Sequence, residues 1–155
     1  MRLRLTILVS SVFVLVSTVA LPAQTVQGSA SDIAEIHRII DAHATGWNQG
    51  DARMVAHLWH EDGDIRNSDE GVIKSRAAIQ ARYEKMFAGW AKGTVHSHPG
   101  AVTIRFLSPD VVVADGFYQV DGIKGTDGKQ QPAEKGSWTI VCTKVNGVWG
   151  IASLR

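Results

Sequence analysis

The spacing of apolar residues changes once along this 155-residue chain, from helical to alternating. Between residues 32 and 49, apolar side chains recur every three or four positions: Ile33, Ile36, Ile40, Ala44 and Trp47. Asp32 followed by Glu35 resembles a capping box, and Gly50 is a stop signal. The pattern predicts an amphipathic helix that starts at Asp32 and buries one face.

Two further helices are expected after this one. Asp51 can cap a short helix over residues 52–60, which carries Ala52, Val55, Leu58 and Trp59 on one side. A third helix is predicted behind Ser75, where the spacing of three and four returns at Ile79, Tyr83, Met86, Phe87 and Trp90.

From Thr94 onwards the apolar residues alternate, which is typical of strands. Residues 101–107 and 111–120 flank the turn cluster at 108–110, and residues 137–145 and 148–154 flank Asn146-Gly147, so each pair predicts a hairpin. Residues 122–136 read as a long polar loop. The predicted fold is a single α+β domain with three helices near the start, followed by an antiparallel sheet.

The last hairpin allows its register to be predicted. A two-residue Asn-Gly loop places Lys144 opposite Trp149, Cys142 opposite Ile151 and Ile140 opposite Ser153. One face then carries Trp138, Ile140, Cys142, Trp149 and Ile151, with Arg155 beside Trp138. The other face is apolar too, so we expect the helices to cover one side and a partner subunit the other, giving a homodimer.

The first 23 residues have the layout of a secretory signal peptide, with Arg2 and Arg4 before an apolar run and small residues at the end. We expect cleavage after Ala23, or after Ala20, and a periplasmic or secreted protein without a membrane segment; an uncleaved anchor helix is the alternative. Residues 24–31 would form a short tether, and residues 32–155 one domain.

The composition narrows the choice of partners. Loss of Arg2 and Arg4 changes the formal net charge from +1 to −1, and no basic cluster is left to attract nucleic acid. Cys142 is the single cysteine, so an internal disulfide is excluded, and its apolar neighbours favour a place in the core.

The segment GWNQGDARMVAHLWHEDGDIRNSDEGVIKSRAAIQARYEKMF resembles the first half of nuclear-transport-factor-2-like domains, and NGVWGIASLR resembles their last strand. The resemblance implies a strongly curved, cystatin-like sheet wrapped around the long helix, forming a cone with an apolar pocket. This superfamily includes ketosteroid isomerases, dehydratases, epoxide hydrolases, polyketide cyclases and members that only bind ligands. The chain is most similar to small exported bacterial members without an assigned function. The resemblance also implies that no metal or cofactor is needed.

The segment HLWHEDGDIRNSDEG, residues 57–71, is the first candidate for chemistry. His57 and His60 are three residues apart, and with Asp62 they offer a weak alternative as metal ligands. A solvated acidic turn between helix and strand is the favoured interpretation. The isomerase resemblance places a proton-abstracting carboxylate where this chain has Asn67, and an amide cannot act as that base. Asn67 could still orient a ligand carbonyl or a water molecule.

Asp115 is the predicted acid or base. It shares a strand face with Val111, Val113 and Phe117, and if that face is the concave one, burial would raise the pKa of its carboxyl group. Alternatively, Asp115 and Gly116 mark a bulge, or the carboxylate faces outward. His96 and His98 alternate onto one face near the expected mouth of the cone and are candidate proton carriers.

Aromatic side chains and one terminal cation complete the predicted site. The candidates for ligand binding are Trp59, Tyr83, Phe117, Trp138, Trp149 and Arg155. The sequence thus predicts an exported domain that binds a small, mostly apolar organic molecule. Two functions stay open: a cofactor-free isomerase, dehydratase, cyclase or hydrolase acting by proton transfer, or a non-catalytic carrier or dimerising accessory subunit.

Overall fold

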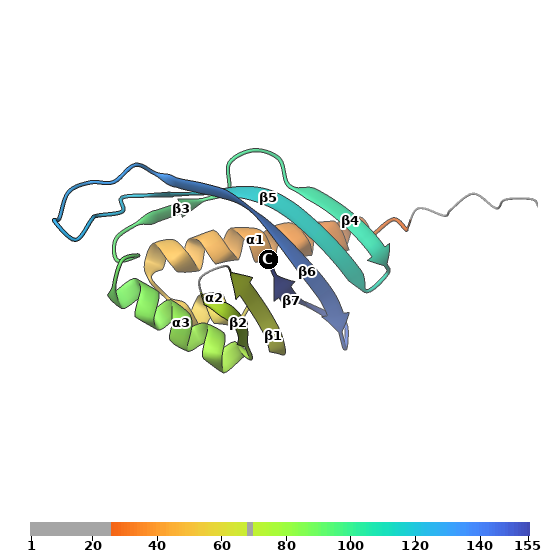
Figure 1. The fold of residues 1–155 in the computed structure, drawn as a ribbon. Coiled ribbons are helices and arrows are strands. Elements are labelled where there is room, and N and C mark those ends of the chain that lie inside the picture. The colour runs from red at the N-terminus through yellow and green to blue at the C-terminus, as the bar shows by residue number, and fades with distance from the viewer. Residues whose placement is uncertain (1–25, 68–69) are drawn as a thin grey trace, which may run out of the picture.

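The structure, a computed structural model, describes residues 26–67 and 70–155 and has an α+β fold in which a curved sheet arches over a long helix (Figure 1). The elements are α1 (Ala30–Gln49), α2 (Ala52–Ala56), β1 (Trp59–Asn67), β2 (Gly71–Lys74), α3 (Arg76–Ala88), β3 (Val95–Ser97), β4 (Thr103–Ser108), β5 (Val111–Asp121), β6 (Glu134–Val145) and β7 (Val148–Leu154). The predicted signal peptide and both predicted cleavage positions lie outside the described residues.

The long helix α1 starts earlier than its apolar pattern predicted. Its N-cap is Ser29, whose Oγ accepts a hydrogen bond from the backbone N–H of Asp32 at 3.1 Å. Asp32 therefore lies in the first turn and is not the cap. At the other end Gly50 adopts φ 65°, a left-handed conformation that glycine accepts at little cost, and the helix stops there as predicted.

The other two helices differ in how well the sequence anticipated them. Asp51 caps α2 as predicted, but that helix ends at Ala56 and β1 begins at Trp59, where the sequence pattern predicted a continuing helix. Ser75 caps α3, and Ile79, Tyr83 and Met86 are buried as expected. The three helices lie near the start of the chain as predicted, but strands β1 and β2 lie between α2 and α3, so the helices do not all precede the sheet.

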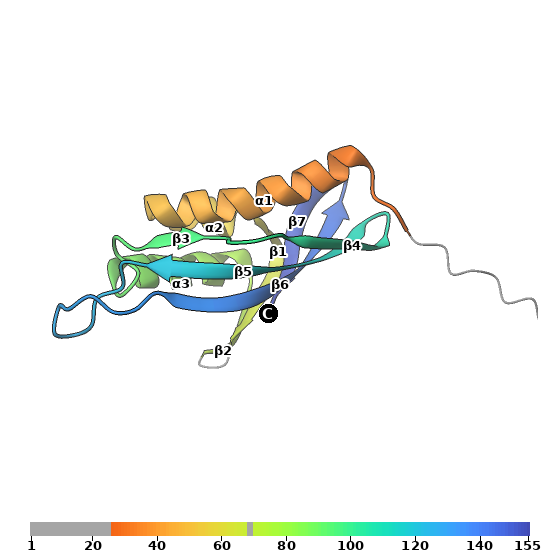
Figure 2. The same cartoon turned by 90° about the horizontal axis from the view of Figure 1, so that it is seen from above.

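The sheet has seven strands in the order β2-β1-β7-β6-β5-β3, and β4 also pairs with β5. The curved sheet does not close into a barrel, and in the view from above α1 runs along one side of the sheet (Figure 2). Strands β1 and β7 are parallel, whereas the other pairs are antiparallel. The sheet is thus mixed, which corrects the prediction of a purely antiparallel one.

The last hairpin follows its predicted register only near the turn. Lys144 pairs with Trp149 and Cys142 with Ile151, as predicted. Beyond that point one extra residue in β7 shifts the register, so Ile140 pairs with Leu154 instead of Ser153. This is a β-bulge, and it turns Leu154 to the same side as Ile140. The predicted buried set of Trp138, Ile140, Cys142, Trp149 and Ile151 is confirmed.

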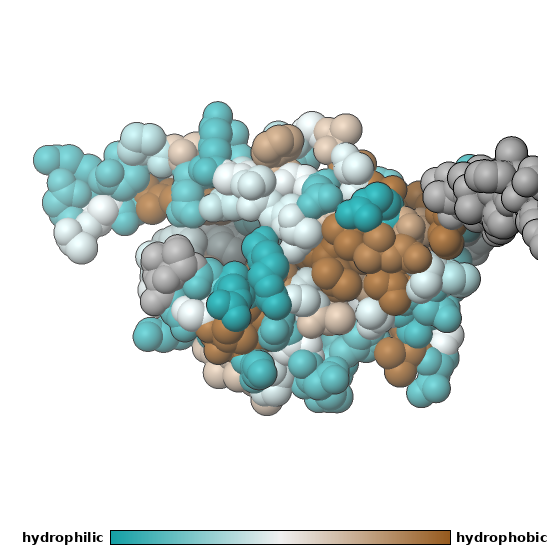
Figure 3. All heavy atoms as spheres, turned by 45° about the vertical axis from the view of Figure 1, so that its right-hand side comes forward, coloured by the Kyte–Doolittle hydropathy of each residue, from teal (hydrophilic) through white to brown (hydrophobic). Residues whose placement is uncertain are grey.

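The opposite side of the sheet carries several exposed apolar side chains. Phe117 is 59% exposed, and Val145 and Val148 at the last turn are exposed as well. The space-filling view in Figure 3 shows a patch of apolar side chains among polar ones on one face of the molecule. Among the described residues, no helix is both long and apolar enough to span a membrane.

Candidate functional site

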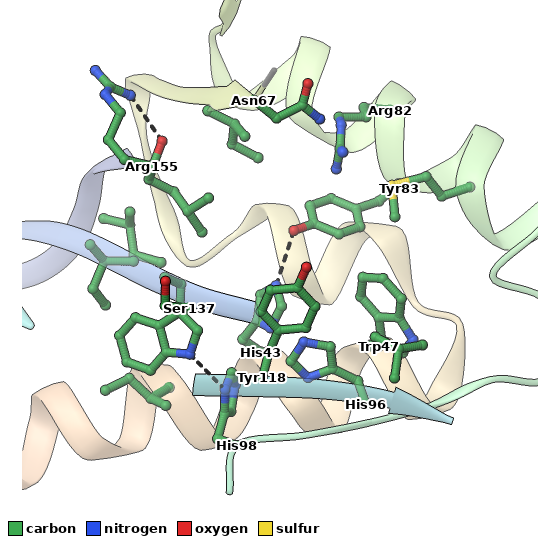
Figure 4. Close-up of a pocket in the computed structure, with 18 of the residues that line it drawn as sticks. His43, Trp47, Asn67, Arg82, Tyr83, His96, His98, Tyr118, Ser137 and Arg155 are labelled. Atoms are coloured by element: carbon green, nitrogen blue, oxygen red, sulfur yellow. Dashed lines mark hydrogen bonds between the residues drawn. The ribbon is translucent and has the colours of Figure 1, made fainter. Parts of the chain in front are cut away.

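A pocket of about 460 Å³ opens between α1, α3 and the concave side of the sheet. Ligand pockets for small organic molecules have volumes of roughly 300–1,000 Å³, so this one is large enough for such a molecule. Its apolar lining includes Ile39, Ile40, Ile65, Met86, Val120, Ile140, Ile151 and Leu154. Its polar residues include three histidines on the buried side and, across the pocket from them, a rim that contains Asn67, Arg82 and Arg155 (Figure 4).

The first histidine, His43, comes from α1. It follows Ile40 by three residues and precedes Trp47 by four, so it lies on the buried face of the helix. Its Nε2 is 3.0 Å from the hydroxyl oxygen of Tyr83, which comes from α3 (Figure 4). The sequence analysis did not select His43. A lone histidine on an otherwise apolar helix face was the signal that could have found it.

The second histidine, His96, lies on the short strand β3, which a side chain of α1 holds in place. The backbone N–H of His96 donates to Oδ1 of Asn48 at 2.7 Å, and Nδ2 of Asn48 donates to the carbonyl of His96 at 3.0 Å. Nearby, Nε1 of Trp47 donates to Oγ1 of Thr94, and both side chains are buried. Three hydrogen bonds therefore hold β3 and the residue before it against the end of α1.

The third histidine, His98, follows β3 and contacts the indole of Trp138. Nε1 of Trp138 lies 3.1 Å from Nδ1 of His98 and 3.1 Å from the carbonyl oxygen of Phe117. The indole can lie flat against β5 because its cross-strand neighbour is Gly116: a Cβ there would come within 2.4 Å of Cζ2 of Trp138. Gly116 therefore determines where the indole, and with it His98, is held.

His43, His96 and His98 form one contiguous group, called the histidine group below. Their ring centroids are 4.7–5.9 Å apart, and one nitrogen from each ring lies within 4.8 Å of the others. Among the described residues, the buried side-chain nitrogen and oxygen atoms without a hydrogen-bond partner are Nδ1 of His43, Nδ1 of His96 and Nε2 of His98. All three histidines line the pocket.

Burial keeps the histidine group uncharged. It lowers the pKa of His43 well below 6.5, with smaller contributions from His96, His98 and Arg82. Burial also lowers the pKa of His96 to about 4. It lowers the pKa of His98 as well, although the hydrogen bond with the carbonyl oxygen of Phe117 acts in the opposite direction and raises it. Burial raises the pKa of the Tyr83 phenol to about 12. At neutral pH this side of the pocket therefore holds three neutral imidazoles and a protonated phenol.

The polar rim consists of Arg66, Asn67, Arg82 and Arg155. Nδ2 of Asn67 donates to the carboxylate of Glu70, which also accepts from Arg82, and Arg155 donates to Asp64. Among the residues that line the pocket the one acid is Glu134, which accepts a hydrogen bond from the exposed hydroxyl of Tyr118. The rim therefore carries cationic side chains, of which Arg82 and Arg155 are each paired with a carboxylate, while the buried side is neutral.

The family of the chain can be assigned from its sequence. The model of the SnoaL-like domain matches residues 28–155. The chain belongs to the SnoaL-like family. This family is part of the nuclear-transport-factor-2-like superfamily, so the predicted resemblance is confirmed. No curated protein matches the chain.

Solved structures that resemble this SnoaL-like domain support the fold. A protein of unknown function with a cystatin-like fold from Nostoc punctiforme is 16% identical, with a TM-score of 0.71 over 83% of this chain and 92% of the other. A hexachlorocyclohexane dehydrochlorinase from Novosphingobium barchaimii is 18% identical, with a TM-score of 0.72 over 80% and 84%. A candidate scytalone dehydratase from Novosphingobium aromaticivorans is 18% identical, with a TM-score of 0.68 over 80% and 81%. The predicted cystatin-like α+β fold is thereby confirmed.

The SnoaL-like domain brings six of the predicted site residues together. Those that line the pocket are Asn67, Tyr83, His96, His98, Trp138 and Arg155. Arg155 pairs through its backbone with Thr139, one residue from the predicted position beside Trp138, because of the bulge in β7.

Asp115 lies on the other side of the sheet. Its inward neighbours on β5, Val112 and Ala114, are fully buried, whereas Asp115 is half-buried and its Oδ1 accepts a hydrogen bond from Oγ1 of Thr139. Pairing with β6 is continuous through Asp115 and Gly116, so no bulge occurs there. The condition for a base at Asp115, that its face be the concave one, is therefore not met.

Three of the aromatic residues that were predicted to bind a ligand do not line the pocket. Trp59 is buried behind the pocket, with ring contacts to His43 and Tyr83. Phe117 shares the outer face with Asp115. Trp149 is buried near the start of α1, where its Nε1 donates to Asp32 at 2.8 Å.

The structure does not support the alternative metal site that the sequence offered at His57, His60 and Asp62. His57 caps the end of α2 and lies 3.0 Å from the carbonyl of Arg53, while His60 lies on β1 and is 3.0 Å from the carbonyl of Thr143. The two histidines therefore do not share a helix face. In the described part of the chain, the group of three or more side chains that could hold a metal ion is the histidine group.

Proposed function

We propose that this SnoaL-like domain binds a small, mostly apolar organic molecule in the pocket and catalyses an elimination by proton transfer. The observation that carries the proposal is the combination of an apolar pocket of about 460 Å³ with three neighbouring imidazoles, one buried and two half-buried, each of which has a buried nitrogen without a hydrogen-bond partner. A lone pair that is kept out of water and without a partner is ready to accept a proton, either directly or through a water molecule held by the group.

The chemistry needs three things that the pocket supplies. The histidine group removes a proton from a carbon atom, the C–H electron pair forms the new double bond, and the leaving group departs with its bonding electrons. The apolar walls keep bulk water away, and the N–H donors of the arginines and of Asn67 at the rim suit the developing negative charge on the leaving group. The names of the dehydrochlorinase and of the candidate dehydratase each denote an elimination, which favours this reaction over the isomerisation, cyclisation and hydrolysis also expected.

The alternative is a non-catalytic ligand carrier or a dimerising accessory subunit. A non-catalytic role is favoured by the small number of carboxylates in the pocket. Asn67 occupies the position where the isomerase resemblance places a carboxylate, and Glu134 accepts a hydrogen bond from Tyr118. A carrier would bind the same class of molecule and leave it unchanged.

Binding and turnover can be measured separately. Trp47 and Trp138 line the pocket, so a bound molecule should change the intrinsic fluorescence. Suitable probes are a polychlorinated cyclohexane, with chloride release followed by ion chromatography, and a cyclic β-hydroxy ketone, with the conjugated enone followed by absorbance. We expect turnover of at least one probe, and about 100-fold slower turnover in His98→Gln, since a positioned base contributes about 10²–10⁴-fold.

The matched control is His37→Gln, which changes an exposed histidine of α1 and should leave turnover unchanged. Binding without turnover by the wild-type chain would favour the carrier. Absence of both binding and turnover, or full activity in His98→Gln, would contradict the proposal.

We also propose that the chain is exported and forms a homodimer. Export is supported by the arrangement of residues 1–23, and the dimer by exposed apolar side chains such as Phe117 on the outer side of the sheet. Cell fractionation tests the first proposal. Light scattering of the wild type and of Phe117→Ser tests the second, since a monomeric wild type would contradict it.

A further inference from the structure

The histidine group has the composition and the spacing of a metal site. Each ring offers one nitrogen, and the three atoms lie within 4.8 Å of one another. Tetrahedral Zn²⁺ with Zn–N distances of 2.0–2.1 Å places its nitrogens about 3.3 Å apart, so side-chain movements of about 1.5 Å or less would close the group around an ion. The helix α1, the strand β3 and the residue just after β3 supply the three ligands.

In each ring of the group, one buried nitrogen has no hydrogen-bond partner. Nε2 of His43 lies against the hydroxyl of Tyr83, and Nδ1 of His98 lies against Nε1 of Trp138 and the carbonyl of Phe117. In both rings the opposite nitrogen is buried and unpartnered, as is Nδ1 of His96. A metal-binding histidine typically donates its other N–H to an oxygen atom, and the hydroxyl of Tyr83 and the carbonyl of Phe117 can each accept such a bond. The indole N–H of Trp138 can only donate, so binding through Nε2 of His98 requires the tautomer with its proton on Nδ1.

A cation explains these three free nitrogens better than a packing role does. Leaving a buried polar atom without a partner costs roughly 1–3 kcal/mol, and each of these three neighbouring rings has one such atom. A hydrogen-bond donor could satisfy one or two of them, whereas a metal ion can accept one lone pair from each ring at once, in the tautomers that leave these nitrogens unprotonated. Imidazole ligands without a carboxylate suit Zn²⁺, Co²⁺, Ni²⁺ and Cu²⁺, and do not suit Ca²⁺ or Mg²⁺.

We propose that His43, His96 and His98 bind one divalent transition-metal ion, with Zn²⁺ as the reference ion, through three imidazole nitrogens. Because all three residues line the pocket, the fourth coordination position faces the cavity, as in catalytic rather than structural zinc sites. The superfamily resemblance implied a metal-free site, and this inference departs from it. The binding of the ion stands independently of the proposed elimination. Only its role, to hold the water molecule that accepts the proton, rests on the proposed function.

Metal binding can be measured directly on the chain, prepared without a histidine tag and treated with a chelator. Titration with Zn²⁺ against a chromophoric chelator gives the stoichiometry and affinity, and Co²⁺ absorption reports tetrahedral coordination. We expect one ion per chain and a loss of affinity of at least about 100-fold in each of His43→Gln, His96→Gln and His98→Gln. Tyr83→Phe should lose about 10–100-fold, as expected for a residue that orients a ligand.

Two controls make the result specific. His37→Gln should bind the ion like the wild type, and so should His57→Gln, which tests the sequence-based alternative site. Circular dichroism of each variant excludes unfolding as the cause of lost affinity. Failure of the wild type to bind a stoichiometric ion, or ion binding that survives the triple histidine variant, would overturn the inference.

Turnover with and without the ion separates this inference from the proposed function. Stoichiometric binding without turnover of either probe would keep the metal site and reject the elimination. Turnover by a chain that binds no ion would keep the elimination and reject the metal site.

Discussion

Asn48 joins the end of α1 to the strand that carries His96, and its removal should loosen that part of the pocket. Its side-chain amide both accepts from and donates to the backbone of His96, at 2.7 and 3.0 Å. The substitution Asn48→Ala deletes both hydrogen bonds and leaves the β3 backbone groups without that partner. We therefore expect it to act on His96 without contacting a ligand.

The expected loss of stability follows from two partly exposed hydrogen bonds. Each contributes about 0.5–1.5 kcal/mol, which gives about 1–3 kcal/mol for the pair. Alanine is the better helix former by about half a kcal/mol, which offsets part of the loss. We expect the free energy of unfolding to fall by about 1–2 kcal/mol, and the melting temperature by about 3–8 °C in a domain of this size.

Urea unfolding, monitored by tryptophan fluorescence, measures the change in the free energy of unfolding. The rate of hydrogen exchange of the His96 backbone amide measures how easily β3 opens locally. The control is Gln49→Ala, which changes the next residue at the same helix end, an exposed side chain. The reasoning is refuted if Asn48→Ala is as stable as Gln49→Ala, or if the His96 amide exchanges no faster in it than in the wild type.

Three further predictions concern packing, pH and reactivity. Gly116→Ala should destabilise the chain by about 1–3 kcal/mol through overpacking against the indole of Trp138, and adding Trp138→Phe should recover part of the loss; equal effects with and without that second change would contradict the clash. Arg155 lowers the pKa of Asp64 in the folded protein by donating hydrogen bonds to its carboxylate. This pair should therefore stabilise the fold fully above the pKa of Asp64 in the unfolded chain, about 3.9, and the stabilisation should be lost as the pH falls through the lower pKa of the folded state. Asp64→Asn should flatten that acid limb of stability, and an unchanged pH profile would reject the assignment. Burial raises the pKa of the Cys142 thiol to about 12, so a thiol reagent should label Cys142 only after unfolding, and rapid labelling of the native chain would show that the core opens there.

The sequence predicted those parts of the fold that depend on local signals. Ser75 as a helix cap and Asn146-Gly147 as a hairpin turn both act within a few residues, and the structure has them as expected. The bulge in β7 has no such local signal, because Ala152 fits either register equally well. The parallel pairing of β1 with β7 depends on how the whole sheet closes around α1, which alternation within one strand does not encode.

The site was predicted in part for a similar reason. His96 and His98 were found because they alternate at a strand end, and Asn67 because it occupies a family position. Asp115 was misplaced because β5 is apolar on both faces, so its pattern does not tell which one is concave. His43 was missed because the buried stripe of α1 runs through Ile36, Ile39, Ile40 and Trp47, slightly rotated from the predicted one.

The extra residue in β7 decides which chemistry the end of that strand presents to the cavity. With Ala152 in place, Leu154 points inward next to Ile140, and the hydroxyl of Ser153 is bonded to Asp64. In a regular ladder without the bulge, Ala152 would pair with Val141 and Ser153 with Ile140, so the serine hydroxyl would face the chamber and the leucine would point outside. The bulge at Ala152 therefore decides whether this part of the wall is apolar or hydrogen-bonding, although the backbone irregularity itself lies beside the cavity and not in it.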